Sequence, residues 1–225
     1  MLDPVAEKLW ETSRPLKAPG LRLDHRMVVV RLSSGALLIH SPVQLDEALV
    51  GELAALGPVR HLVAPSLFHD LYWPAWFARY PAATFWGVPG LREAHPELPF
   101  GEVLHPDQPT PWEAELPKLF LGGMPKLNEY AFFHPSSRSL ILADLVFNLS
   151  PDQQLLGKLF LKANGVYGKV ACSRIFRAFI KDRNAFKDSV EGVLEWEIEK
   201  IIPGHGENVT QDGRQVLRRA FGWLH

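Results

Sequence analysis

Short apolar runs with strand character alternate with helical segments along most of the chain, and this alternation constrains the fold more than any other feature. The runs 27–32 and 36–40 flank a tight Ser-Ser-Gly turn and predict a β-hairpin. Leucines at helical spacing follow over 45–56 and stop at Gly57, which predicts a helix with a glycine at its end. Strand pairs with helices between them favour a fold of the α/β class.

The rest of the chain continues this pattern. Residues 89–117 are rich in proline and predict irregular surface structure around one short element. Further strands are expected at 61–65, 84–88, 118–121, 129–133, 139–143 and 200–202, and further helices at 73–80, 151–162, 173–180, 186–194 and 213–223.

Composition narrows the classes of partner. The 225 residues carry 24 basic and 25 acidic side chains, and no basic run suggests nucleic acid or a membrane surface as a partner. The single cysteine, Cys172, excludes an internal disulfide and a site of several thiolates, which is typical of a reducing compartment. With no signal-peptide pattern, we expect one domain over 1–225 in the cytoplasm, acting on a small molecule, and the sequence leaves the oligomeric state open.

Polar residues of the metal-ligand type follow three of the predicted strands. They are His69 and Asp70, Asp144, and His205, which lies between two glycines. Loops at strand ends commonly carry chemistry, so these side chains are expected to converge on one rim. Two of them also have a structural reading: His205 as a surface or capping histidine, and Asp144 as a helix cap or a buried hydrogen-bonding group.

Four segments in this order and spacing, 35–42, 63–70, 139–148 and 201–206, resemble the metallo-β-lactamase superfamily. The resemblance is closer to its DUF4336 branch of uncharacterised metal-dependent hydrolases. It implies an α/β (α+β) fold, a four-layer αββα sandwich in which loops at one edge of the two sheets hold the metal.

The resemblance also implies a set of ligands. Asp70 matches a ligand position of the first metal motif and His69 an intervening one, while Asp144 and His205 match the bridging aspartate and the last histidine. His40 replaces the aspartate that usually ends the second strand, and we expect it beside the metal ligands. No histidine lies near 123–126, where another ligand would fall, so one ion is expected rather than two.

The implied activity is hydrolysis by a water molecule that a single Zn, Fe or Mn ion activates, with attack on an ester, amide or phosphoester. Asp70 and Asp144 are the candidate catalytic residues that orient or deprotonate this water. The alternative is a degenerate site without metal, in a protein that keeps the fold and serves as a binding or interaction module.

Two further features each have two readings. The aromatic residues of 73–80 line either the core or a pocket beside Asp70, and the core is the commoner use of such a stripe. The basic residues of 157–183 form either a solvated face or a surface that attracts an anionic substrate.

Overall fold

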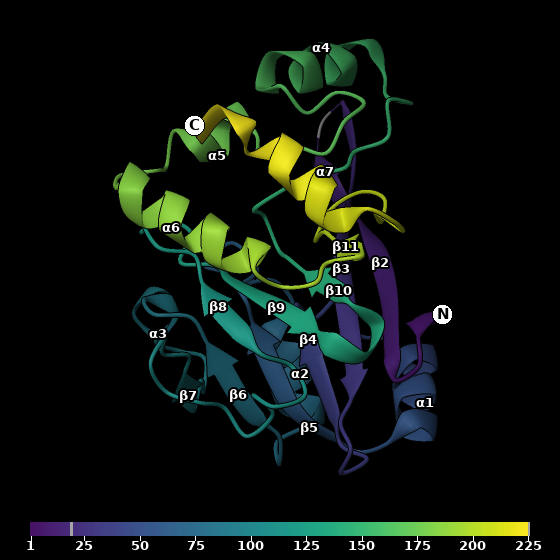
Figure 1. The fold of residues 1–225 in the computed structure, drawn as a ribbon. Helices are drawn as coiled ribbons and strands as arrows, with labels where there is room; N and C mark the ends of the chain where they lie inside the picture. The colour runs from purple at the N-terminus through teal and green to yellow at the C-terminus, as the bar shows by residue number, and fades with distance from the viewer. Residues whose placement is uncertain (19, 225) are drawn as a thin grey trace.

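Two mixed β-sheets pack face to face in the computed structural model, which describes residues 1–18 and 20–224 (Figure 1). The larger sheet has the order β1-β2-β3-β4-β5-β6-β7, antiparallel up to β4 and parallel beyond it. Its strands are β1 (Asp3–Ala6), β2 (Leu9–Ala18), β3 (Leu21–Arg31), β4 (Leu37–His40), β5 (Val59–Ala64), β6 (Thr84–Gly87) and β7 (Glu102–Val103).

The smaller sheet has the order β11-β10-β9-β8, with β10 parallel to β11 and antiparallel to β9. Its strands are β8 (Lys118–Phe120), β9 (Tyr130–His134), β10 (Ser139–Ile141) and β11 (Lys200–Ile202). The helices are α1 (Glu47–Leu56), α2 (Trp73–Arg79), α3 (Leu91–Ala94), α4 (Leu155–Asn164), α5 (Arg174–Arg177), α6 (Arg183–Leu194) and α7 (Gly213–Ala220), and Pro135–Ser137 and Gly222–Leu224 form 3-10 turns.

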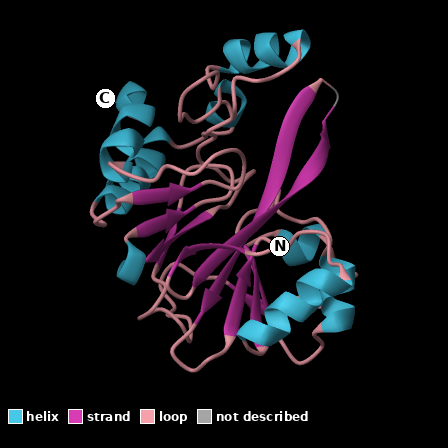
Figure 2. Ribbon diagram, turned by 90° about the vertical axis from the view of Figure 1, so that its right-hand side faces the viewer, coloured by secondary structure: helices cyan, strands magenta, loops and turns pink. Residues whose placement is uncertain are grey.

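Alternation of side chains along the smaller sheet shows that it is covered on both faces. In β9, Tyr130 and Phe132 belong to the core shared with the larger sheet, whereas Ala131 and Phe133 belong to a second core. The second core is completed by α6 and α7, and the far side of the larger sheet is covered by α1 and α2 (Figures 1 and 2). The layer order is therefore helix, sheet, sheet, helix, as the resemblance implied.

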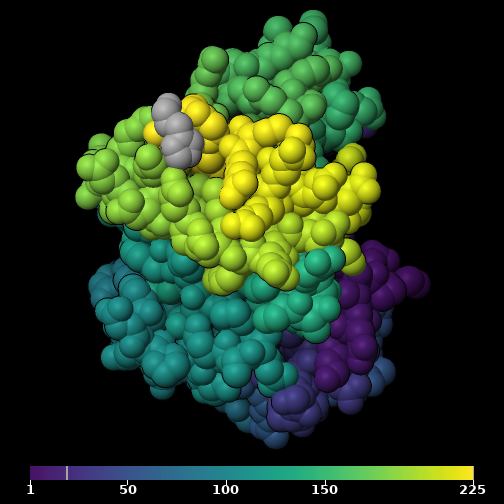
Figure 3. Space-filling model, viewed as in Figure 1, coloured from purple at the N-terminus to yellow at the C-terminus, as the bar shows by residue number. Residues whose placement is uncertain are grey.

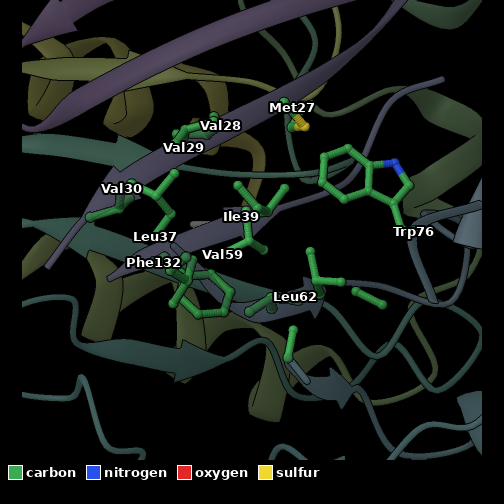
Figure 4. Close-up of a cluster of buried hydrophobic side chains, with 14 of the residues drawn as sticks. Met27, Val28, Val29, Val30, Leu37, Ile39, Val59, Leu62, Trp76 and Phe132 are labelled. Carbon is green, nitrogen blue, oxygen red and sulfur yellow. The ribbon is translucent and has the colours of Figure 1, made fainter. Parts of the chain in front are cut away.

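The main core, which covers both faces of the larger sheet, is dense in aliphatic and aromatic side chains (Figure 4). Trp76 of α2 is fully buried there and its indole Nε1 donates a hydrogen bond of 2.7 Å to the carbonyl of Val43. Trp73 is buried as completely, and Phe77 nearly so. The aromatic stripe of 73–80 is therefore mainly core.

The predicted hairpin and the helix that ends at Gly57 are confirmed as β3–β4 and α1. Strand β3 also pairs along its other edge, with β2, over ten residues. The two strands form a long antiparallel ribbon (Figure 2). Sequence patterns did not predict β1 and β2. Pro15 in β2 lies beyond the short stretch that β1 covers, at a free edge where proline is tolerated.

One helix lies apart from the four layers. Helix α4 packs beside the tip of the β2–β3 ribbon and projects beyond the body of the molecule (Figure 3). Four large apolar side chains on it are exposed, namely Leu155, Leu156, Leu159 and Phe160. In the part of the chain that the structure describes, no helix has the length and apolar character needed to cross a membrane.

A matched pair of substitutions tests the placement of the core. Leu62 of β5 is fully buried in the main core, whereas Leu155 on α4 is 73% exposed. We expect Leu62→Ala to lower the free energy of unfolding by about 2–5 kcal/mol, and Leu155→Ala to change it by less than about 0.5 kcal/mol. Urea denaturation measures both values, and equal losses would contradict the arrangement of layers.

Candidate metal centre

Three of the sequence-predicted ligands, His69, Asp144 and His205, come together in the structure. Their ligand atoms all lie within 4.8 Å of one another. Nε2 of His69 is 3.5 Å from Oδ2 of Asp144, and Nε2 of His205 is 3.3 Å from Oδ1 of the same carboxylate. All three side chains are buried. Two imidazoles thus face one carboxylate in a site with little exposure to water.

The strands explain why residues so far apart in sequence meet. Asp144 and His205 each follow, by three residues, the end of β10 or β11, and these two strands are parallel. His69 lies in the loop after β5, which joins the other sheet through a hydrogen bond from Tyr130 N–H to the carbonyl of Pro65. The ends of strands from both sheets therefore supply the three side chains of the cluster.

The loop that carries His205 is tied down tightly. The guanidinium of Arg26 donates hydrogen bonds to the carbonyls of Pro203 and Gly206, on either side of the histidine. A Cβ atom at Gly204 would lie 2.4 Å from the carbonyl oxygen of Ala143 and 2.9 Å from Cε1 of His69. Glycine is needed at 204 because the two loops touch there, which gives a physical basis to the Gly-His-Gly pattern.

Hydrogen bonds at Nδ1 orient both imidazoles. Nδ1 of His205 donates to the backbone carbonyl of Asp24. Nδ1 of His69 bonds to the hydroxyl of Ser41, which also contacts Nε2 of His25 at 3.0 Å. Because such contacts fix the ring and its tautomer, the Nε2 atoms are left to face Asp144.

Ser41 occupies a strained backbone position. Its φ angle is +57°, in the left-handed region that serine rarely adopts, and its side chain is buried. Strain of this kind persists where surrounding structure fixes it, commonly at functional sites. Sequence reasoning did not single out Ser41 or His25, although Ser41 lies in the motif 35–42.

Nε2 of His69 is buried and has no hydrogen-bond partner among the described residues. Leaving a buried polar atom unpaired is costly, and a metal ion at this point would satisfy it. Burial alone would raise the pKa of Asp144, but the neighbouring His69 and His205 hold it well below its usual range. A deprotonated carboxylate between two Nε2 atoms is a donor set that fits a divalent cation.

A second buried carboxylate supports the first. Oε1 and Oε2 of Glu129 accept hydrogen bonds from the backbone N–H groups of Ala143 and Asp144, at 2.8 and 2.9 Å. Burial, and then the charge of Asp144, raises the pKa of Glu129 to about 8. Glu129 thus holds the loop of Asp144 in place and mostly retains its own proton at neutral pH. No sequence motif marked it, since it only opens the segment that becomes β9.

Asp70 and His40 lie outside the three-residue cluster. The carboxylate of Asp70 is half-buried and its Oδ2 is 3.0 Å from Nε2 of His95. His40 is buried at the end of β4 with its ring edge-on to Phe132, 5.1 Å between centroids, and both of its nitrogens lack hydrogen-bond partners among the described residues. Burial and then the charge of His69 lower the pKa of His40 to about 3, so it is neutral.

The thiol of Cys172 is unreactive, as its sequence context suggested. It is fully buried, and burial raises the pKa of its thiol to about 12. A thiol with so high a pKa is neither a nucleophile nor a metal ligand at neutral pH. The chemistry of the site therefore rests on imidazole and carboxylate groups.

Solved structures with the same fold are numerous. The chain is similar to a metallo-beta-lactamase from Pontibacter korlensis, with a TM-score of 0.69 at 12% identity, over 100% of this chain and 98% of that one. It is similar to the DIM-1 metallo-beta-lactamase, with a TM-score of 0.70 at 15% identity over 100% and 96%. FIM-1 from Pseudomonas aeruginosa, solved in a mono-zinc form, has a TM-score of 0.68 at 12% identity over 100% and 94%. Identities this low establish the fold alone.

Family membership rests on the sequence. A comparison with curated proteins finds no match. The family model described as a domain of unknown function, DUF4336, matches residues 7–162, which is more than half of the chain. The chain therefore belongs to the DUF4336 family and has the metallo-β-lactamase fold.

Proposed function

We propose that this protein is a metal-dependent hydrolase that holds one divalent ion between His69, Asp144 and His205. The observation that carries the proposal is the buried Nε2 of His69, which has no hydrogen-bond partner among the described residues and, like Nε2 of His205, faces the carboxylate of Asp144. An ion bound between the two rings and the carboxylate would give that nitrogen a direct partner.

The donor set suits zinc, iron or manganese. Two imidazoles and one carboxylate supply three ligands, and catalytic sites of this kind keep further positions open for water and substrate. An ion bound there would supply Lewis acidity, which polarises a carbonyl or phosphoryl oxygen and lowers the pKa of water.

The surrounding residues prepare the ligands. Ser41 and the carbonyl of Asp24 hold the two rings by their Nδ1 atoms, and Glu129 holds the backbone at Asp144. Partners of this kind orient ligands and are costly to remove. His40 stays neutral and buried beside the site, so it adds no charge that would compete with a cation.

We assign Asp70 to proton transfer rather than to metal binding. It directly follows His69, is partly exposed, and pairs with His95, so its carboxylate reaches solvent while the cluster does not. A carboxylate paired with an imidazole is a common arrangement for moving a proton to or from a reacting water. The sequence had placed Asp70 in both roles.

Metal content tests the site directly. Protein reconstituted with Zn²⁺ and desalted should hold about one ion per chain by elemental analysis, and His205→Ala and Asp144→Ala should each hold almost none, because two remaining ligands bind an ion weakly. His105→Ala, an exposed histidine elsewhere, serves as the control. Wild-type protein that takes up no metal would favour the binding-module alternative, and retention by both ligand variants would place the metal elsewhere.

The role of Asp70 is tested by separating binding from turnover. We expect Asp70→Asn to keep its metal and to lose about 10²-fold or more of the turnover of whichever ester, lactone or phosphodiester the wild type hydrolyses, because general acid–base groups contribute on that scale. Metal content and initial rates are measured on the same preparation. Loss of the metal would make Asp70 a ligand, and unchanged turnover would remove it from the mechanism.

A further inference from the structure

An apolar pocket of about 180 Å³ lies between the tip of the β2–β3 ribbon, α4 and α5. Its wall is almost entirely carbon, although it is open to solvent, with Phe160 and Ile175 partly exposed at its rim. The inner wall is formed by Leu21, Leu23, Phe147, Leu161, Val166 and Phe176. Helix α4 projects from the body of the molecule (Figure 3) and packs on β3, and Phe147 and Leu149 complete the wall of the pocket.

The pocket reaches the candidate metal centre through one ring. Phe147 lines the pocket, and its other side stacks on the imidazole of His205 with 5.6 Å between centroids and 8° between planes. Phe176, which also lines the pocket, contacts both Phe147 and Phe68, the neighbour of His69. Aromatic side chains therefore connect the pocket with both histidine ligands.

The segment that builds the pocket is strongly basic. Between 155 and 181 there is no acidic residue, and there are six basic ones, Lys158, Lys162, Lys169, Arg174, Arg177 and Lys181, in a chain whose net charge is -1. Arg174 is next to two lining residues and donates from Nη1 to the carbonyl of Ala163 on α4. An anion is attracted to such a rim, and a cation is repelled.

We propose that this pocket binds the apolar chain of an anionic amphiphile, the substrate whose reacting group lies at the His69–Asp144–His205 site. That the amphiphile is the substrate of the metal site rests on the proposed function, whereas binding of its apolar chain in the pocket does not. An apolar wall selects a hydrocarbon or aryl chain, the basic rim selects negative charge, and the stacked Phe147 places the pocket against a metal ligand. A second copy of this chain fits less well, because two basic faces would repel each other.

Decanoate is the probe, with decyltrimethylammonium as its cationic counterpart of equal chain length, and titration calorimetry on the full zinc-reconstituted chain is the measurement. We expect decanoate to bind at least tenfold more tightly than the cation. Leu23→Trp and Val166→Trp, which fill the pocket from two different segments, should each weaken decanoate binding at least tenfold. Ala163→Trp, which adds the same ring at an exposed position of α4, should leave it unchanged.

The proposal is overturned if wild-type protein binds no decanoate, if it binds the cation equally well, or if both filled variants that keep the wild-type near-ultraviolet circular dichroism bind like the control. Two filled variants from separate segments keep the test usable if one of them fails to fold. Titration of chelator-treated protein separates this proposal from the proposed function. Decanoate binding that survives metal removal upholds the pocket whatever the ion does, whereas one bound metal without decanoate binding overturns the pocket alone.

Discussion

The buried carboxylate of Asp144 is the group on which the arrangement of the site depends. A buried charge is costly unless it is paired and hydrogen-bonded. Here Nε2 of His69 and of His205 face its two oxygens, and the hydroxyl of Ser66 donates to Oδ2 at 3.3 Å. Glu129, whose pKa burial and Asp144 raise to about 8, anchors the same loop while mostly protonated. The site thus places one negative charge between two imidazole nitrogens, an arrangement that can hold a cation.

The fold supplies that arrangement through strand direction. Parallel pairing of β10 with β11 brings Asp144 beside His205, and parallel pairing of β4 with β5 carries Ser41 and the His69 loop to the same region. The close approach at Gly204, which leaves no room for a Cβ atom, joins these loops. The geometry of the metal centre therefore depends on the packing of the two sheets, because a shift of either sheet would separate the ligands.

Much of this was predictable from local pattern. Apolar runs and the residues that end them predicted the β3–β4 hairpin, α1 and the strand before His205. The sequence motifs also led us to expect Asp144 and His205 in one site, and the two side chains lie together in the structure. The sequence did not show which of His69 and Asp70 faces the other ligands, because the side chains of neighbouring loop residues point in different directions that only tertiary contacts fix. Here Nδ1 of His69 bonds to Ser41, and the indole of Trp73 donates to the His69 carbonyl at 3.1 Å. Strand β2 and the supporting roles of His25, Ser41 and Glu129 depend on partners distant in sequence, which local pattern does not reveal.

X-ray absorption at the zinc edge, on protein carrying one ion, measures the ligands themselves. We predict a low-coordinate site with two imidazoles and one carboxylate, the same spectrum for Asp70→Asn, and almost no zinc signal for His69→Ala after desalting. An all-oxygen coordination sphere, or a His69→Ala variant that keeps the zinc content and spectrum of the wild type, would contradict this site.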